Sequence, residues 1–218
     1  MKNIKLSKLA ARLGIYCLGL LVLAFGITLA VNSNLGISPV SSLPYALSQI
    51  LNISLGACST VVYAGYILAQ MALSRKFQPI LLLQLVFSTI FGYFVDAAKF
   101  IVGDFRIPTY LGQLAMLGAS IVLIGLSLVL YIDVRLTPMP AEGLIGCIAD
   151  KVGKPFPKIK TLFDCASVLT AAVLCLVFLG KVTGIREGTV LTALLAGRVM
   201  GWIRKRLSGL IQKVCFEE

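Results

Sequence analysis

Long apolar blocks, separated by short charged stretches, constrain the fold of this chain more than any other feature. Of its 218 residues, 58% are hydrophobic and only 13% are charged. A soluble domain carries about 25% charged residues, so the composition indicates a membrane protein, in which about 20 apolar residues cross the hydrocarbon core as a helix. Six segments approach that length: 13–33, 55–73, 79–98, 110–132, 161–180 and 187–203.

Two further apolar segments, 38–50 and 138–150, are too short to cross. As helices of about 13 residues they would reach only about 20 Å. Each has proline near its start, where a helix tolerates the missing N–H, so we expect half-helices that dip into the bilayer and return, or that lie at its surface. The predicted fold class is all-α: a transmembrane helix bundle with six full spans and two short broken helices.

The chain also repeats itself. With a shift of 99 residues, the second half matches the first at four places: Gly19 with Gly118, Gly26 with Gly125, Ser38 with Thr137 and Pro39 with Pro138. This divides the chain into a first membrane repeat, 1–109, and a second, 110–218. Because each repeat holds three full spans, an odd number, the copies would insert with opposite orientation, as in many transporters. If both short segments also crossed, the repeats would be parallel and the spans eight; segment length favours the inverted version.

The distribution of Lys and Arg predicts the orientation in the cell membrane. Cytoplasmic loops carry an excess of these residues, and most of them fall on the side of the two termini, including Lys2, Lys5, Arg75 and Lys76. We therefore expect both termini in the cytoplasm, with a basic tail at 204–218 that forms an amphipathic helix resting on anionic lipid. The eight-span arrangement gives nearly the same excess of Lys and Arg on the cytoplasmic side, so the charges do not show whether the two short segments cross the membrane. The outer segments keep only Lys99, Arg106, Lys181 and Arg186.

The composition argues against several classes of function. The chain has no histidine, which excludes His-dependent zinc sites and Ser-His-Asp triads. Its six cysteines show no CxxC spacing and are expected to pack as small core residues. The basic residues lie at the ends of apolar blocks rather than on one face, which is typical of topology signals and not of nucleic-acid binding. We predict no catalytic residue, metal or cofactor, and no enzyme.

The paired breaks are the first candidate site. A helix that begins at membrane depth leaves N–H groups unpaired and presents a positive dipole end, and broken helices of transporters bind anions there. Ser38 and Thr137 are good N-cap residues placed before a proline. The alternative is a pair of interfacial loops followed by short amphipathic helices. The predicted substrate-binding residues at the breaks are Ser38, Pro39, Thr137 and Pro138.

Charged residues within the apolar segments are the second candidate. Arg198 needs a carboxylate if it is buried, and Glu142 and Asp164 are available on the same side of the membrane, so the three are predicted to form a cluster beside the second break. The alternative is that Arg198 reaches the headgroups by snorkelling. Asp96 is expected to pair locally with Lys99, three residues on.

Glycines at helical spacing predict close helix contacts. We expect packing within one bundle, rather than dimerisation, for Gly19, Gly26, Gly118, Gly125, Gly197 and Gly201.

Three short motifs resemble the YczE/YyaS/YitT group of bacterial multi-pass membrane proteins. They are Leu35-Gly36-Ile37-Ser38-Pro39-Val40 with the short segment to Ser48, Leu55-Gly56-Ala57-Cys58-Ser59, and Gly184-Ile185-Arg186-Glu187-Gly188-Thr189-Val190-Leu191 followed by Gly197. The chain departs from the group at Val40, where an aromatic is usual, and at the inserted-looking Arg186-Glu187. The resemblance implies an integral membrane protein of the cytoplasmic membrane and supplies neither substrate nor catalytic residue.

Two functions remain open. The first is a small transporter whose site for a small molecule or ion lies between the repeats, with the lipid bilayer as its surroundings. The second is a membrane accessory or regulatory protein that acts through its basic cytoplasmic face, where Lys151, Lys154, Lys158 and Lys160 gather.

Overall fold

The computed structural model describes residues 6–74 and 79–216, and every regular element in these ranges is an α-helix. The all-helical prediction is confirmed. Lys2, Lys5, Arg75 and Lys76, the topology signals named above, lie outside the described residues. In chain order the helices are α1 (Leu6–Ser33), α2 (Pro39–Leu51), α3 (Leu55–Ser74), α4 (Pro79–Val102), α5 (Tyr110–Asp133), α6 (Pro140–Val152), α7 (Phe156–Leu179) and α8 (Glu187–Cys215).

Five of these helices, α1, α3, α4, α5 and α7, are long and apolar enough to cross a membrane. The sixth predicted span, 187–203, is the first part of α8, which does not meet that criterion because charged residues such as Arg198 and Arg204 interrupt its apolar sequence. The fifth predicted span, 161–180, begins earlier than expected, at Phe156, because Pro155 and Pro157 suit the start of a helix. Lys158 and Lys160 therefore belong to the first turns of α7 and not to a loop.

The two short helices, α2 and α6, have 13 residues each, as predicted. Each follows an extended residue and has proline in its first turn, and each ends at a left-handed residue, Asn52 or Gly153. A left-handed residue stops an α-helix by satisfying its last carbonyl groups. Both helices are about 20 Å long at most, less than the thickness of the hydrocarbon core.

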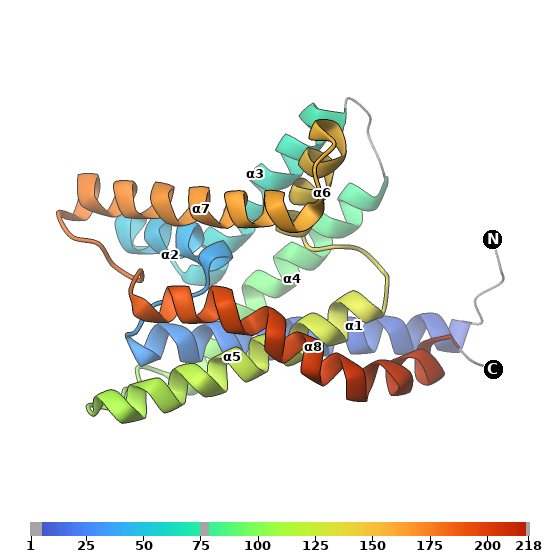
Figure 1. The fold of residues 1–218 in the computed structure, drawn as a ribbon, viewed down its shortest axis with the longest axis horizontal. Coiled ribbons are helices and arrows are strands. Elements are labelled where there is room, and N and C mark those ends of the chain that lie inside the picture. The colour runs from blue at the N-terminus through green and yellow to red at the C-terminus, as the bar shows by residue number, and fades with distance from the viewer. Residues whose placement is uncertain (1–5, 75–78, 217–218) are drawn as a thin grey trace.

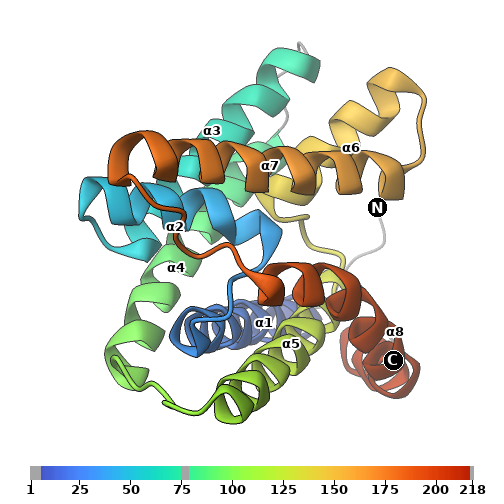
Figure 2. The same ribbon diagram turned by 60° about the vertical axis from the view of Figure 1, so that its left-hand side comes forward.

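The helices form two layers, as Figure 1 shows. One layer contains α1, α5 and α8, with α5 packed between the other two, and the second contains α2, α3, α6 and α7. Figure 2 shows α4 running from one layer to the other, and α4 packs against both α1 and α3. The start of α1 and the end of α8 lie at the same end of the molecule (Figure 1).

The contact between α3 and α4 is unusually close. A Cβ on Gly56 would lie 2.0 Å from the carbonyl oxygen of Gly92 and 2.6 Å from Asp96. Asp96 accepts hydrogen bonds from the Gly56 N–H and the Ser54 hydroxyl, both at 2.8 Å, and so caps the start of α3. The predicted local pair of Asp96 with Lys99 is therefore wrong, because Asp96 faces α3 and Lys99 pairs with Asp104 at 2.6 Å.

The end of α8 continues the helix instead of forming a separate surface segment. Ile203, Ile211 and Cys215 are buried in the same core as Tyr16, whereas Leu210 and Val214 remain exposed. The expected amphipathic character of the tail is present, but its inner face packs on protein.

Candidate functional site

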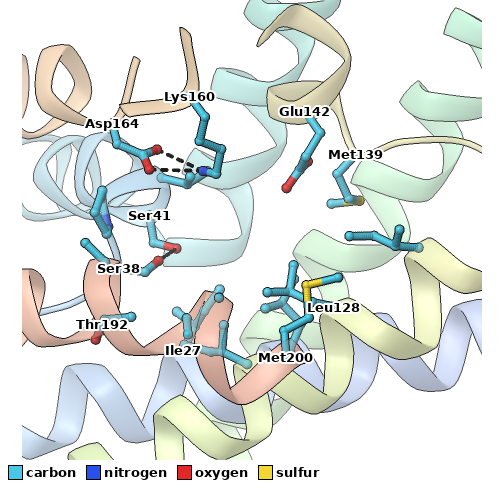
Figure 3. A pocket seen from close by; sticks show the side chains of 18 of the residues that line it. Ile27, Ser38, Ser41, Leu128, Met139, Glu142, Lys160, Asp164, Thr192 and Met200 are labelled. Carbon is cyan, nitrogen blue, oxygen red and sulfur yellow. Dashed lines mark hydrogen bonds and ion pairs between the residues drawn. The ribbon is translucent and has the colours of Figure 1, made fainter. Parts of the chain in front are cut away.

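A cavity of about 630 Å³ lies between the two layers. Both short helices reach it with their first turns, α2 with Ser38 to Ser41 and α6 with Met139 and Glu142. The remaining walls come from α1, α3, α5, α7 and α8. Figure 3 shows Ser38 and Ser41 on one side, Glu142 on the other, and the paired side chains of Lys160 and Asp164 from α7 beside them. The first turns of both short helices therefore face one cavity, although Thr137 and Pro138, the residues predicted at the second break, do not line it.

The first break is held in place by the segment that leads into α8. The Ile37 N–H donates to the Gly184 carbonyl at 3.0 Å, and the Gly188 N–H donates to the Leu35 carbonyl at 2.7 Å. Gly36 has a φ of +112°, and a Cβ there would lie 2.6 Å from the Thr189 hydroxyl oxygen. Only glycine fits such a position. The first and third motifs of the family resemblance thus form one structural junction.

The start of α2 agrees with the prediction in part. Ser38 is the N-cap residue and Pro39 follows it in the first turn. The Ser38 side chain makes no capping hydrogen bond to the helix, however; its hydroxyl donates to the Ser41 hydroxyl at 3.0 Å. Both side chains line the cavity.

The second break begins its helix two residues later than predicted. Met139 is the N-cap residue and Pro140 follows it, so the predicted N-cap at Thr137 is wrong. Proline disfavours a helical conformation in the residue before it, and Met139 is accordingly extended. Thr137 and Pro138 line a second, smaller cavity of about 460 Å³, which shares Glu142 with the main one.

Residues of α1 hold this second break. The buried Arg12 donates to the Val134 carbonyl at 2.9 and 3.1 Å and to the Arg135 carbonyl at 2.9 Å. A cation at the end of α5 is favoured by the helix dipole. The Tyr16 hydroxyl donates to the Thr137 carbonyl at 3.2 Å. Arg12 therefore has a structural role at this break.

The structure does not assemble the predicted cluster of Glu142, Asp164 and Arg198. Arg198 is exposed on α8 and does not line either cavity. Asp164 accepts from Lys160, four residues earlier, at 3.0 and 3.1 Å, so lysine takes the place proposed for arginine. Both carboxylates do line the main cavity.

Glu142 is the least satisfied charged group of the cavity. Its Oε1 accepts from the Tyr131 hydroxyl at 3.1 Å, whereas its Oε2 is buried and makes no hydrogen bond within the described part of the chain. The hydroxyl of Thr192, on α8, is likewise buried and unpaired among the described residues. Both groups line the main cavity, so a molecule bound there could form a hydrogen bond with each of them.

The predicted packing glycines divide into two groups. A Cβ on Gly19 or Gly26 would press against α5, and one on Gly125 against α8, at 2.7 to 3.0 Å. Gly118, Gly197 and Gly201 have open space at that position, so they make no close helix contact with the described part of the chain. All three lie at exposed positions, and Gly197 borders the cavity.

Among the cavity residues that sequence reasoning missed, three are of most interest, because two bond the carboxylates and one carries a buried hydroxyl that is unpaired among the described residues. The spacing of Lys160 and Asp164 on one helix was a readable signal, because residues four apart lie on the same face. Tyr131 and Thr192 gave no such signal, since their positions depend on how α5 and α8 pack. The three are Tyr131, Lys160 and Thr192.

The five long apolar helices and the cavity between their layers define an integral membrane protein with two broken helices. Comparison with known sequences places it more closely. The chain belongs to a family described as "Family of unknown function (DUF6198)", which matches residues 10–205.

Two proteins of Bacillus subtilis (strain 168) are similar to nearly the whole chain. YyaS is 30% identical over 186 residues, which cover 85% of this chain and 88% of YyaS. YczE, which is described as a membrane protein, is 29% identical over 196 residues, or 89% of this chain and 86% of its own. The resemblance to this group is thereby confirmed. No solved structure matches the chain significantly.

Proposed function

We propose that this protein is a small transporter in which two inverted repeats, 1–109 and 110–218, alternate access to the cavity between the layers. The single observation that carries the proposal is that the first turns of both short helices, α2 and α6, face one cavity. In this arrangement α8 supplies the sixth span, with both termini in the cytoplasm, and the exposed Arg198 reaches the headgroups.

The contacts between helices support the repeat. If α1 to α4 correspond to α5 to α8, the packing of α1 on α4 matches that of α5 on α8. In the same way α3 with α6 matches α7 with α2, and α2 with α3 matches α6 with α7. The breaks correspond too, since Asn34 and Arg135, at the ends of α1 and α5, both have a positive φ, 58° and 53°.

Two pairs break the correspondence. The minor contact of α1 with α8 has no comparable counterpart between α5 and α4 in the described chain, and the second pair is α3 with α4. The close contact of α3 with α4 has no comparable counterpart between α7 and α8 in the described chain, and the cavity lies where that contact is missing. In the proposed orientation, the α3–α4 contact closes the outer side and the gap between α7 and α8 faces the cytoplasm. If the two repeats exchange conformations, the protein reaches the outward-facing state, in which α7 packs on α8 and α3 is separated from α4.

The accessory or regulatory function remains the second candidate. It is favoured by the row of exposed basic residues at the end of α8, which includes Lys205, Arg206 and Lys213. Such a face suits an acidic partner or an anionic membrane surface. This function does not require the cavity to be reached from both sides.

Cysteine accessibility distinguishes the two functions without knowledge of a substrate. In a chain with all six native cysteines replaced, a single cysteine in place of Ala196, which lines the cavity, is treated with a membrane-impermeant maleimide. Spheroplasts expose the outer face and inverted vesicles the inner face. The transporter predicts labelling in both preparations. Asp104→Cys and Lys151→Cys control for sidedness, each reacting in one preparation only. Labelling of Ala196→Cys from a single face would contradict alternating access.

A further inference from the structure

The charges that line the main cavity do not balance. Lys160 and Asp164 bind each other at 3.0 and 3.1 Å, so their charges cancel locally. Glu142 remains. Among the described residues, the side chain that donates a hydrogen bond to its carboxylate is the neutral Tyr131 hydroxyl, at 3.1 Å, and no cation forms an ion pair with it. A buried carboxylate oxygen without a partner is costly. The cavity therefore has an unmet requirement for a positive group or a donor near Glu142 (Figure 3).

The surroundings of Glu142 suit an organic cation better than a hydrated metal ion. The cavity is lined mostly by apolar side chains, and aromatic rings of Tyr63, Tyr131 and Phe156 stand among them. Aromatic faces attract organic cations, whereas hard metal ions need several oxygen ligands. A cavity of about 630 Å³ also falls in the usual range of drug-sized ligand sites, about 300–1,000 Å³.

Most of the groups that would attract an anion are already engaged; the hydroxyl of Thr192 is an exception. Lys160 would have to give up Asp164 to bind one. At the start of α2, the hydroxyl groups of Ser38 and Ser41 bind each other at 3.0 Å. The first turn of α6 carries Glu142 itself, which repels a second negative charge there. These contacts argue against an anion at the breaks, which helix dipoles alone had led us to expect.

We propose that the cavity binds an organic monocation with an apolar body, and that Glu142 binds its charged end. The inference names a substrate class for the proposed transporter and rests on that function. Binding is nevertheless measured on the purified protein in detergent, where no transport takes place. Its outcome is therefore independent of the cysteine-accessibility result.

The test uses two probes of nearly the same shape and opposite charge, tetraphenylphosphonium and tetraphenylborate. Equilibrium dialysis of the full chain, with protein-free micelles subtracted, should show saturable binding of the cation and at least tenfold weaker binding of the anion. Glu142→Gln should weaken binding of the cation at least tenfold, and Glu142→Asp should restore part of it. Glu187→Gln is the control, because Glu187 lies at the start of α8 outside the cavity and should leave binding unchanged.

Size-exclusion elution and melting temperature verify that Glu142→Gln is folded, and Glu142→Asp replaces it if it is not. Equal binding of both probes, preference for the anion, or unchanged binding of the cation to a folded Glu142→Gln would each overturn the proposal. If the cation binds but Ala196→Cys is labelled from one face only, the proposed ligand class stands and the proposed transport function fails. If Ala196→Cys is labelled from both faces but the cation does not bind, the transport function stands and the ligand class fails.

Discussion

If the two halves correspond as we propose, the junction of α3 with α4 is the counterpart of the junction of α7 with α8, yet only the first is closed. Gly56 and Gly92 let α3 and α4 approach until no Cβ fits between them, and Asp96 bonds the start of α3 to α4. Between α7 and α8 lies the cavity instead. Small residues and one well-placed carboxylate close the first junction. The second junction also has small residues and a carboxylate, among them Gly197 and Asp164, but there they border the cavity.

The same contrast separates glycines that resemble each other in sequence. Gly92 on α4 and Gly197 on α8 both belong to the last helix of their half. A Cβ on Gly92 would lie 2.2 Å from the Thr60 hydroxyl, whereas Gly197 has no neighbour within 4 Å. A glycine therefore indicates where helices can approach and not that they do.

The largest effect is expected from filling the closed junction. Gly56→Val places a branched side chain against the Gly92 carbonyl and Asp96, and overpacking of this kind costs about 1–3 kcal/mol. We expect a clearly lower melting temperature in detergent. Gly65→Val, on the same helix but exposed with open space around it, should change stability by no more than about 0.5 kcal/mol. Equal melting temperatures for the two variants would show that the α3–α4 contact is not close.

A smaller effect is expected from removing the carboxylate that caps α3. Asp96→Ala leaves the Gly56 N–H and the Ser54 hydroxyl without their acceptor, and loss of an N-terminal cap costs about 0.5–2 kcal/mol. Chemical or thermal unfolding measures it. Asp104→Ala is the matched control, because Asp104 is exposed and pairs with Lys99 on the surface. A control as damaging as Asp96→Ala would contradict the capping role.

The smallest effect is expected at the open junction. Gly197→Ala adds a methyl group where no neighbour lies within 4 Å, and alanine is better than glycine inside a helix by about 1 kcal/mol. Stability should stay the same or rise slightly, by the same unfolding measurement. Marked destabilisation would indicate that α7 packs against α8 in the membrane.

Much of this architecture was predictable from local sequence. The lengths of the apolar segments predicted the five long helices, and the prolines predicted the two short ones. The start of α6 was misplaced because Pro138 and Pro140 both suit a first turn, and only the packing of Tyr16 and Arg12 against the segment before α6 shows which is used. The sequence also did not show that Arg12 is buried and Arg198 exposed, since burial of an arginine depends on which helix ends reach it.

The site itself was predictable only in part. Ser38, Pro39 and both carboxylates, which stand out in apolar sequence, line the main cavity, whereas Thr137 and Pro138 do not line it. The partners of those carboxylates were not predicted, since Tyr131 approaches Glu142 through the packing of α5 on α1 and not through spacing along the chain.

Distances between spin labels across the two junctions test the central claim most directly. One pair replaces Ala57 and Ala97 at the α3–α4 junction, and the other replaces Leu162 and Lys205 on α7 and α8, all at exposed positions. Double electron–electron resonance is recorded in lipid nanodiscs on the cysteine-free chain with and without Gly56→Val, which forces α3 from α4. The account predicts reciprocal shifts: the α3–α4 distance lengthens while the α7–α8 distance shortens. A longer α3–α4 distance with an unchanged or longer α7–α8 distance would contradict it.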